Sequence, residues 1–426
     1  MSTPLLSYEE AAAMVVGYAG SLDRTPPVLE RVGLTRALGR VLAESLAADV
    51  DQPPFARSTR DGFACRAAEA STHARLKVTG TTHAGEAPAG PLPAKAVWEI
   101  MTGAPVPSGA DAVMMIEHVE RDGDGVRLTP PRKIKPGDNI VAQGAQARRG
   151  DALLPSGTRI GPAQVALAAS CGYAELTVFA RPRVAILATG DELVPVESKP
   201  GPGQIRNSNA PMLAALVSAA GGEPWVLPSA ADTDESLNDA LDQAVEADLL
   251  LISGGVSAGK FDLVEPALER KGARFHFTGV RIQPGKPTVF GDVTRWAGGD
   301  LTRTVKPGIL PFFGLPGNPI SSAATFLLFA APVLRALAGD RELDPHFVLA
   351  ELTKDTDRQG KPGLTRFLPA RCEFYPPGSR LPQVATVPWH GSGDLPAFAR
   401  SNCFVVVPEQ AGRLEAGAIV RILLLS

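Results

Sequence analysis

Three stretches of the sequence decide the fold: VAILATGDEL at residues 184–193, LLLISGGVS at 249–257 and ILPFFGLPGNP at 309–319. In each stretch a short apolar run ends at a glycine-rich turn, and a helix-like pattern follows. Apolar runs of this length that are bounded by glycine are typical of buried parallel strands. Ligands of open α/β sheets bind outside the carboxyl ends of the strands. We therefore expect the three turns to converge on one crevice that holds the functional site.

The 426-residue chain is long enough for two to four domains. Strands and helices alternate from Val184 to about Leu337, which predicts a doubly wound, mostly parallel sheet. Short β-like pieces separated by Pro and Gly predict a β-rich inserted domain. A return of such pieces after Leu343, closing with Ile419–Leu424, predicts a small barrel-like C-terminal domain. The expected fold is therefore multidomain α/β, with 1–50 and 148–180 as a helical linking domain, 51–147 inserted, 181–338 as the α/β domain and 339–426 at the C-terminus.

Helices are predicted at four places outside the three turns. Ser7-x-x-Glu10 is a capping box for a helix that runs to about Gly20. Leucine spacing predicts a second helix over Leu34–Leu46, and Pro162–Ser170 predicts a third. A fourth helix is predicted over Asp232–Glu246, with Asp232 as its cap.

Composition restricts the class of protein. A formal net charge of −3 argues against general binding of nucleic acid, which requires a basic surface. Four scattered cysteines without a Cys-x-x-Cys pair fit a reducing cytosol, so we expect a cytoplasmic protein. The first residues do not have the pattern of a signal peptide. The longest apolar run, Ala323–Leu334, is too short to cross a bilayer, so no membrane partner is expected.

Glu192 and Asp262 each follow a strand and a glycine turn. Carboxylates in that position suit Mg²⁺, a hard cation that usually shares oxygen ligands with substrate phosphates. The alternative is that a carboxylate here only caps the next element. The run Gly254-Gly255-Val256-Ser257 can cradle a phosphate with its backbone N–H groups, or be no more than a flexible turn.

Further candidate residues lie on other turns. Arg281 and Lys286 flank a proline-stiffened loop that ends at Pro287, where a fixed ammonium suits an oxyanion. A solvated surface turn is the alternative. Asp61-Gly62, Thr102-Gly103 and Gly391-Ser392-Gly393 are turn-like by themselves.

The ordered set of motifs resembles the molybdopterin molybdenumtransferase family, which includes the E domain of gephyrin. The resemblance covers nearly the whole chain. It rests on Ala37–Glu44, Asp61–Ala64, Met101–Pro107 with Gly109–Val113, Thr189–Leu193, Gly254–Ser257 with Asp262, Pro284–Pro287 and Gly314–Pro319. So many motifs in one order are far more specific than any one of them.

This resemblance implies an elongated homodimer of four-domain subunits that joins molybdate to adenylylated molybdopterin and releases AMP, with Mg²⁺. It implies that Asp61 reaches the site from the partner's inserted domain, and that Glu192, Asp232 and Asp262 serve nucleotide, Mg²⁺ or catalysis. Lys286, Ser321 and Ser392 lie where members bind oxyanions. The remaining substrate or nucleotide contacts are expected from Thr102, Gly190, Gly254, Gly255, Ser257, Arg281, Pro287 and Asn318. The implied protein partners are the molybdopterin adenylyltransferase and recipient molybdoenzymes.

The chain departs from the family pattern in three places. Ala145-Gln146 follows Gly144 where members have an acidic pair, Leu364 follows Gly363 where members often have Arg, and Arg60 precedes Asp61 where Met is common. Two other functions therefore stay open. One is a diverged, non-catalytic protein that binds the pterin or acts as a scaffold. The other is the related adenylyltransferase, against which the chain length argues. Tungsten in place of molybdenum also stays open.

Overall fold

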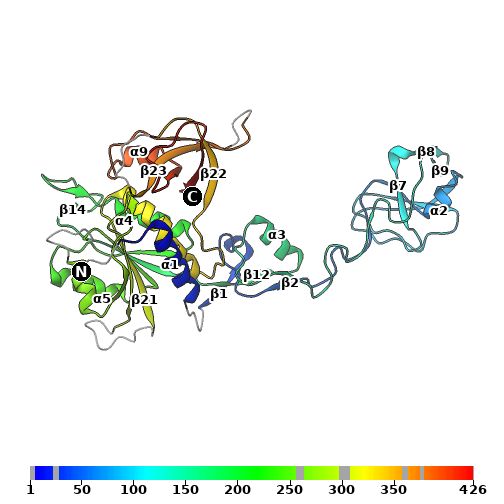
Figure 1. Ribbon diagram of the computed structural model, residues 1–426. Coiled ribbons are helices and arrows are strands. Elements are labelled where there is room, and N and C mark those ends of the chain that lie inside the picture. The colour runs from blue at the N-terminus through cyan, green and yellow to red at the C-terminus, as the bar shows by residue number, and fades with distance from the viewer. Residues whose placement is uncertain are drawn as a thin grey trace.

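The computed structural model describes residues 5–22, 28–255, 263–296, 308–356, 363–374 and 379–425. Figure 1 shows an elongated molecule. The α/β region, residues 181–338, and the C-terminal barrel form one end. A linking region lies in the middle, and the inserted β-rich region forms the far end.

The α/β region is built on one mixed sheet with the strand order β16-β13-β17-β21-β20-β18. The parallel strands are β16 (Glu223–Val226), β13 (Arg183–Ala188), β17 (Leu249–Ser253) and β21 (Ile309–Leu315). The antiparallel strands are β20 (Val289–Thr294) and β18 (Arg274–Phe277). The mostly parallel sheet is confirmed. The sequence analysis did not predict the antiparallel edge.

Side chains alternate between the two faces of this sheet. Val184 and Ile186 of β13 belong to one core cluster, and Ala185 and Leu187 belong to another. Helices α1 (Tyr8–Ser21), α4 (Asn209–Ala219), α7 (Pro319–Thr325) and α8 (Ala331–Leu337) contribute to the first cluster. Helices α5 (Asp234–Ala244) and α6 (Val264–Arg270) contribute to the second. Each face of the sheet is therefore covered, as a doubly wound fold requires.

Helix α1 begins where its capping box predicts. Ser7 Oγ accepts a hydrogen bond from Glu10 N at 3.1 Å, and Glu10 Oε2 accepts one from Ser7 N at 2.7 Å. The helix packs its buried Tyr8 and Val15 into the α/β core although the sequence analysis grouped residues 1–50 with the linking region. The boundaries of the linking domain remain a prediction.

One helix is longer than its apolar run suggests. A π-helical segment, Phe326–Ala330, joins α7 to α8. The resulting helix, Pro319–Leu337, is long and apolar enough to cross a bilayer. However, 83% of its most apolar window is buried inside the protein. This burial is typical of the core helix of a globular domain.

The inserted region is a mixed sheet with the order β7-β4-β6-β5-β9-β8. Its strands are β4 (Gly62–Cys65), β5 (Leu76–Thr82), β6 (Ala96–Ile100), β7 (Ala112–Met115), β8 (Val119–Asp122) and β9 (Gly125–Leu128), with the short helix α2 (Ala67–Ala70). Two chain segments connect it to the linking region, where β3 (Arg57–Ser58) pairs with β10 (Ile140–Val141). The predicted β-rich insertion is confirmed.

The linking region contains the paired strands β1 (Leu29–Gly33) and β12 (Glu175–Phe179), the pair β2 (Leu46–Ala47) and β11 (Ala152–Leu154), and helix α3 (Pro162–Ser170). The prediction of a helix over Leu34–Leu46 is wrong. Only the 3₁₀ turn η1 (Leu34–Arg36) forms, Gly39 follows with φ +75°, and Val41 and Leu42 form β-bridges. Pairing with Arg159 and Val178, both distant in the sequence, outweighs the local leucine spacing.

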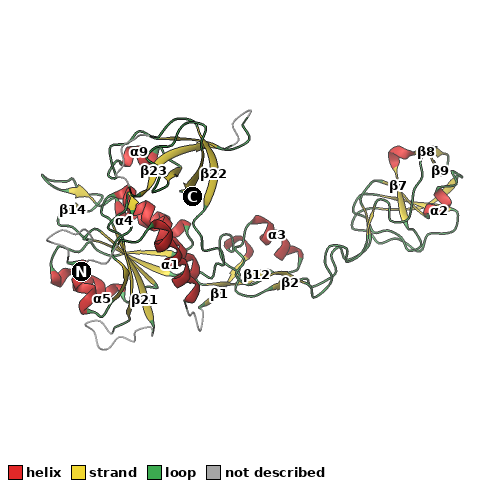
Figure 2. Ribbon diagram, viewed as in Figure 1, coloured by secondary structure: helices red, strands yellow, loops and turns green. Residues whose placement is uncertain are grey.

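The C-terminal strands close on themselves. Strands β22 (Phe347–Leu352), β23 (Thr365–Glu373), β24 (Gln383–Thr386), β25 (Cys403–Val407) and β26 (Ile419–Leu424) form a ring, because β23 also pairs with β25. The ring packs above the α/β region in Figure 2. Strand β19 (Ile282–Gln283) of the α/β region pairs with β23, so the two regions share backbone hydrogen bonds. The predicted barrel-like domain is confirmed.

Candidate functional site

The turns that follow β13, β17 and β21 lie side by side at the carboxyl edge of the sheet. Thr189 N donates to Ser253 O at 3.0 Å, and Gly254 N donates to Leu315 O at 3.2 Å. These bonds join the ends of the three strands. The convergence of the three turns that the sequence predicted is therefore present, with Gly190, Gly254 and Asn318 on neighbouring turns, and the crevice between them stays a prediction.

The glycines after β17 are required by close packing. Gly254 has φ +94°, and a Cβ at this position would lie 2.5 Å from Thr189 O. Gly255 has φ +62°, and its Cβ would lie 2.7 Å from Thr189 Oγ1. Thr189 Oγ1 is buried and has no hydrogen-bond partner in the described part of the chain. Backbone and a buried hydroxyl thus meet at the base of the crevice. Ser257 lies outside the described residues.

Carboxylates gather on the adjacent turns. Asp191 Oδ1 accepts a hydrogen bond from Asp232 N at 3.0 Å, and Glu192 follows Asp191. Partial burial, followed by the negative charge of Asp191 and that of Glu192, raises the pKa of Asp232. A bound cation would relieve this concentration of negative charge. The arrangement therefore brings together Glu192 and Asp232, two of the predicted catalytic residues.

Asp232 is not the cap of α5, which corrects the sequence-based expectation. The N-cap is Thr233, whose Oγ1 accepts from Ser236 N at 3.3 Å, and the helix begins at Asp234. Hydroxyl acceptors occupy this position as readily as carboxylates do. The Asp232 carboxylate is therefore not used to begin the helix.

The start of the helix at Pro319 forms the other wall. Ile320 N donates to Ser392 O at 3.0 Å, which seats the loop of the C-terminal barrel on the first turn of α7. Ser321 lies in that turn and is buried. The loop that carries Lys286 and Pro287 packs nearby, since a Cβ at Gly285 would lie 2.5 Å from Thr325 Cγ2. Ser321 and Ser392 thus lie at the start of α7, the loop that carries Lys286 packs against Thr325 at its last residue, and the Lys286 side chain is exposed.

The Arg281 side chain contacts two segments that are far apart in the sequence. Its Nε donates to Glu409 Oε1 at 3.2 Å, and its Nη1 donates to Leu5 O at 2.8 Å. The guanidinium therefore connects the N-terminal segment to the C-terminal barrel. A contact of Arg281 with substrate remains a prediction.

Asp61 and Thr102 lie together in the inserted region. Asp61 Oδ1 accepts from Thr102 N at 2.6 Å and from Thr102 Oγ1 at 2.8 Å. These two hydrogen bonds lower the pKa of Asp61 and keep it ionised. The inserted region lies at the opposite end of the molecule from the crevice (Figure 1). A single chain therefore does not bring Asp61 to Glu192.

One departure from the family pattern, Ala145-Gln146, lies on the surface. The arginine nearest the departure at Leu364 is bonded within the barrel. Ala145 and Gln146 are exposed on the connection to the inserted region. Arg366, two residues beyond Leu364, is buried, and its Nη2 donates to Gly412 O at 2.7 Å. Burial lowers the pKa of this guanidinium.

The sequence analysis did not single out Asn207 or Asn209. Asn209 Nδ2 donates to Ser253 Oγ at 2.8 Å and to Gly317 O at 2.6 Å, so it touches two of the three turns. Two asparagines around Ser208, just before a helix pattern, were the available signal. Such residues are also common as helix caps, which gives the signal little specificity.

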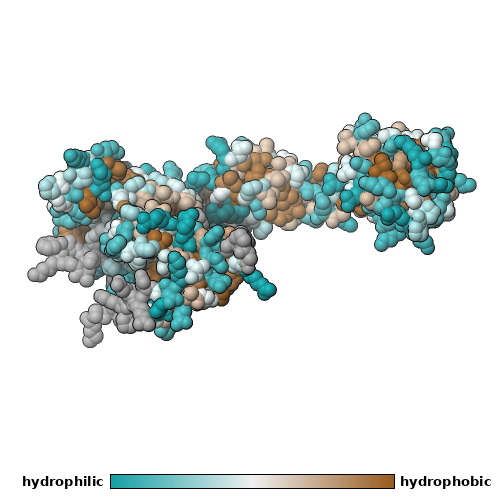
Figure 3. All heavy atoms as spheres, turned by 90° about the horizontal axis from the view of Figure 1, so that it is seen from above, coloured by the Kyte–Doolittle hydropathy of each residue, from teal (hydrophilic) through white to brown (hydrophobic). Residues whose placement is uncertain are grey.

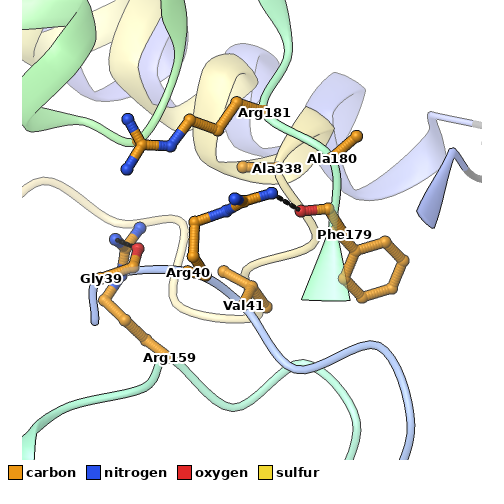
Figure 4. A pocket seen from close by; sticks show the side chains of 9 residues that line it. Gly39, Arg40, Val41, Arg159, Phe179, Ala180, Arg181 and Ala338 are labelled. Atoms are coloured by element: carbon orange, nitrogen blue, oxygen red, sulfur yellow. Dashed lines mark hydrogen bonds between the residues drawn. The ribbon is translucent and has the colours of Figure 1, made fainter. Parts of the chain in front are cut away.

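A separate, shallow hollow lies near the start of β13, at the amino edge of the sheet (Figure 4). Arg40, Arg159 and Arg181 line it. Arg40 Nη2 donates to Glu30 Oε2 and Phe179 O, and Arg159 binds Asp340 at 2.7 Å. The Arg40 contacts lie within the linking region, whereas the Arg159–Asp340 ion pair joins this region to the segment that follows the α/β region.

The described residues contain no group of three or more His, Cys, Asp or Glu side chains placed to hold a metal ion. Asp262, a predicted metal ligand, lies outside them. Mg²⁺ does not need such a group, because it binds through one or two carboxylates together with water and substrate phosphates. The exposed oxygens of Glu192 and Asp232 have the donor chemistry that this cation prefers.

The fold and the site define a multidomain α/β protein whose candidate residues lie on turns at the carboxyl ends of its parallel strands. Comparisons with known families are more specific. Residues 6–172 match the MoeA N-terminal region (domain I and II), residues 185–336 match a probable molybdopterin binding domain, and residues 351–425 match the MoeA C-terminal region (domain IV). The chain belongs to the molybdopterin molybdenumtransferase family, as the similarity of whole chains also shows.

Several curated relatives carry the name molybdopterin molybdenumtransferase. The protein of Bacillus subtilis is 35% identical, with 93% of this chain and 90% of the relative covered. That of Nostoc sp. is 32% identical, with 99% and 94% covered. Among solved structures, the molybdopterin biosynthesis moeA protein of Pyrococcus horikoshii OT3 is 29% identical. It has a TM-score of 0.79, with 99% of this chain and all of the other covered.

Proposed function

We propose that this protein inserts molybdate into adenylylated molybdopterin and releases AMP, to give molybdenum cofactor. The observation that supports the proposal is that carboxylates, a glycine turn and the start of a helix lie at one edge of the sheet. Glu192 and Asp232 stand on one side, Gly254 and Gly255 at the base, and the start of α7 on the other. The match of residues 185–336 to a probable molybdopterin binding domain supports the same assignment.

The substrate carries a phosphoanhydride, and molybdate is a tetrahedral dianion. The Gly254 N–H group is bonded to Leu315 O, so the backbone N–H group of Gly255 would be the one to orient the phosphates, as glycine-rich turns at strand ends do. Ser321, Ser392 and the Lys286 ammonium would hold the oxyanion beside the N-terminus of α7. Preorganised donors of this kind stabilise charge that develops in the transition state. No described side chain has the setting of a covalent nucleophile, so the attacking atom is an oxygen of water or of molybdate.

Magnesium is the cation that we propose for the carboxylates. Glu192 and Asp232 would hold it, with Asp262 as the further predicted ligand, and the bound ion would polarise the phosphoryl oxygens. The raised pKa of Asp232 beside Asp191 and Glu192 supports a cation at this place.

We also propose that the working form is a homodimer in which Asp61 and Thr102 enter the crevice of the partner. The distance between the inserted region and the α/β region within one chain supports this proposal (Figure 1). Apolar atoms gather on the surface of the linking region (Figure 3), where Leu38 and Val50 are exposed. An exposed apolar patch is typical of an interface between proteins.

Four buried free cysteines support a cytoplasmic location. The adenylyltransferase and recipient molybdoenzymes remain the proposed protein partners.

One alternative has a specific observation in its favour. Ala145 and Gln146 replace the acidic pair of the family, which suits a protein that binds the pterin without reaction. The intact Glu192, Asp232 and Lys286 oppose that alternative.

Purified protein incubated with adenylylated molybdopterin, molybdate and Mg²⁺ tests the proposal, with AMP release as the readout. We expect release that depends on molybdate and is lost in Glu192→Gln, which keeps the size of the side chain. Tight binding of the substrate without AMP release would replace the transferase with the non-catalytic alternative.

A further inference from the structure

The segment that begins helix α4 contacts the last residue of β17 and the chain segments that follow β13, β16 and β21. Asn207 N donates to Val194 O at 2.9 Å, beyond β13, and Asn207 Nδ2 donates to Ser229 Oγ at 3.2 Å, beyond β16. Asn209 Nδ2 donates to Ser253 Oγ on β17 and to Gly317 O after β21. The crevice residues lie on these same turns, so one short segment joins the elements that form the crevice.

The orientation of the Asn209 carboxamide follows from its contacts. Gly317 O is a backbone carbonyl and can only accept, so the atom 2.6 Å away must be the amide nitrogen. The two hydrogens on Nδ2 match the two acceptors, Ser253 Oγ and Gly317 O. Asn209 Oδ1 is buried and has no hydrogen-bond partner among the residues that the structure describes. Buried polar atoms in proteins are normally hydrogen-bonded, so this carboxamide is held in place by its two donated bonds alone.

The two turns that Asn209 joins are packed against each other. A Cβ at Gly317 would lie 3.6 Å from Gly254 Cα. Gly254 begins the glycine cradle, and Gly317 directly precedes Asn318 and the N-terminus of α7. The separation of these backbones sets the distance between the cradle and the oxyanion residues. Only a side chain with two donors on one atom can hold both turns from this position.

We infer that Asn209 is a positioning residue, which fixes the spacing between the Gly254 cradle and the Gly317–Asn318 turn. This inference rests on the proposed function, in which the two turns hold different parts of the substrates. Asn209 acts through its neighbours, because its hydrogens are engaged with protein atoms and its Oδ1 is buried. Loss of the carboxamide leaves every substrate-contacting group in the chain but changes the distance between them.

The test compares Asn209→Asp with the wild-type protein. Aspartate has nearly the same shape, but it places an oxygen against Gly317 O, so the two turns separate. Misplacement of reacting groups by an ångström can reduce the rate about 100-fold, so we expect a loss of that order in kcat/KM for AMP release. The loss should appear in kcat as well as in KM, because the spacing matters for the reacting geometry. Ser253→Ala removes one of the two contacts and should give a smaller loss.

The matched control is Asn238→Asp. Asn238 Nδ2 also donates to a backbone carbonyl, Asp234 O at 2.7 Å, but on helix α5 and away from the turns. We expect wild-type kinetics from this variant. Equal losses in the two variants would overturn the inference.

Hydrogen–deuterium exchange separates this inference from the proposed function, because it needs no substrate. Asn209→Asp should speed exchange in peptides that cover 249–255 and 314–320, and leave 366–372 of the barrel unchanged. Unchanged exchange at both turns would overturn the positioning role, whatever the activity. Absence of AMP release from the wild-type protein would instead overturn the proposed function and leave the exchange result to decide on Asn209.

Discussion

The Asp61 carboxylate depends on a single neighbour for its low pKa. Thr102 supplies a backbone and a hydroxyl hydrogen bond to the same oxygen. Thr102→Val keeps the shape and the backbone bond but removes the hydroxyl. We expect the pKa of Asp61 to rise toward its ordinary value, measured by carboxyl ¹³C NMR titration. Thr72→Val is the control, because the Thr72 hydroxyl contacts only backbone groups, Glu69 O and Ala74 N.

The same bonds define how stability depends on pH at this residue. The pKa of Asp61 is lower in the folded protein than in an unfolded chain. Its stabilising contribution is therefore present above the unfolded pKa and is lost as the pH falls through the folded value. Thr102→Val should reduce this acid dependence. A titration curve of Asp61 identical in the two proteins would contradict the prediction.

At the scale of the element, the turn after β17 tolerates only glycine. Gly254→Ala combines a positive φ with a Cβ that would lie 2.5 Å from Thr189 O, a backbone atom. Gly272→Ala, after α6, has φ +80° and nothing within 4 Å of its Cβ. We expect the control to cost about 1 kcal/mol of stability, since the left-handed region disfavours alanine.

Gly254→Ala should lower the free energy of unfolding by about 2 kcal/mol more than Gly272→Ala does. The reason is that the steric clash with Thr189 O adds to the cost of the positive φ. Urea denaturation followed by tryptophan fluorescence measures both. Equal losses would mean that the β13 and β17 turns can move apart freely, which contradicts the close packing of Gly254 on Thr189.

At the scale of the whole molecule, the separation of Asp61 from Glu192 predicts complementation between inactive proteins. Asp61→Asn and Glu192→Gln should each be inactive alone. In a mixed dimer, one crevice combines an intact Asp61 with an intact Glu192. Random exchange of subunits should restore about a quarter of the wild-type AMP release, since half of the dimers are mixed and each has one intact site.

Co-unfolded and refolded mixtures allow the exchange of subunits to be measured by mass spectrometry of the intact dimers. Mixed dimers without activity would show that both residues must come from one chain. Absence of a dimer at any concentration would contradict the proposal that Asp61 enters the site of the partner subunit.

The sequence by itself determined the elements with a strong local pattern. Apolar runs at Val184, Leu249 and Ile309 predicted the parallel strands, and the capping box at Ser7 predicted α1, because these signals depend on neighbours in the chain. It also determined which turns carry the candidate residues, since the ends of parallel strands lie at one edge. The recurrence of family motifs extended this to a function.

The tertiary structure alone decided what depends on residues far apart in the sequence. Leu34–Leu46 is not a helix, because Val41 and Leu42 pair with residues more than 100 positions away. Arg281 binds Leu5 and Glu409, and Asn209 joins two turns, which no local pattern encodes. Long-range contacts follow from the packing of the whole chain, so they become visible only when the fold is complete.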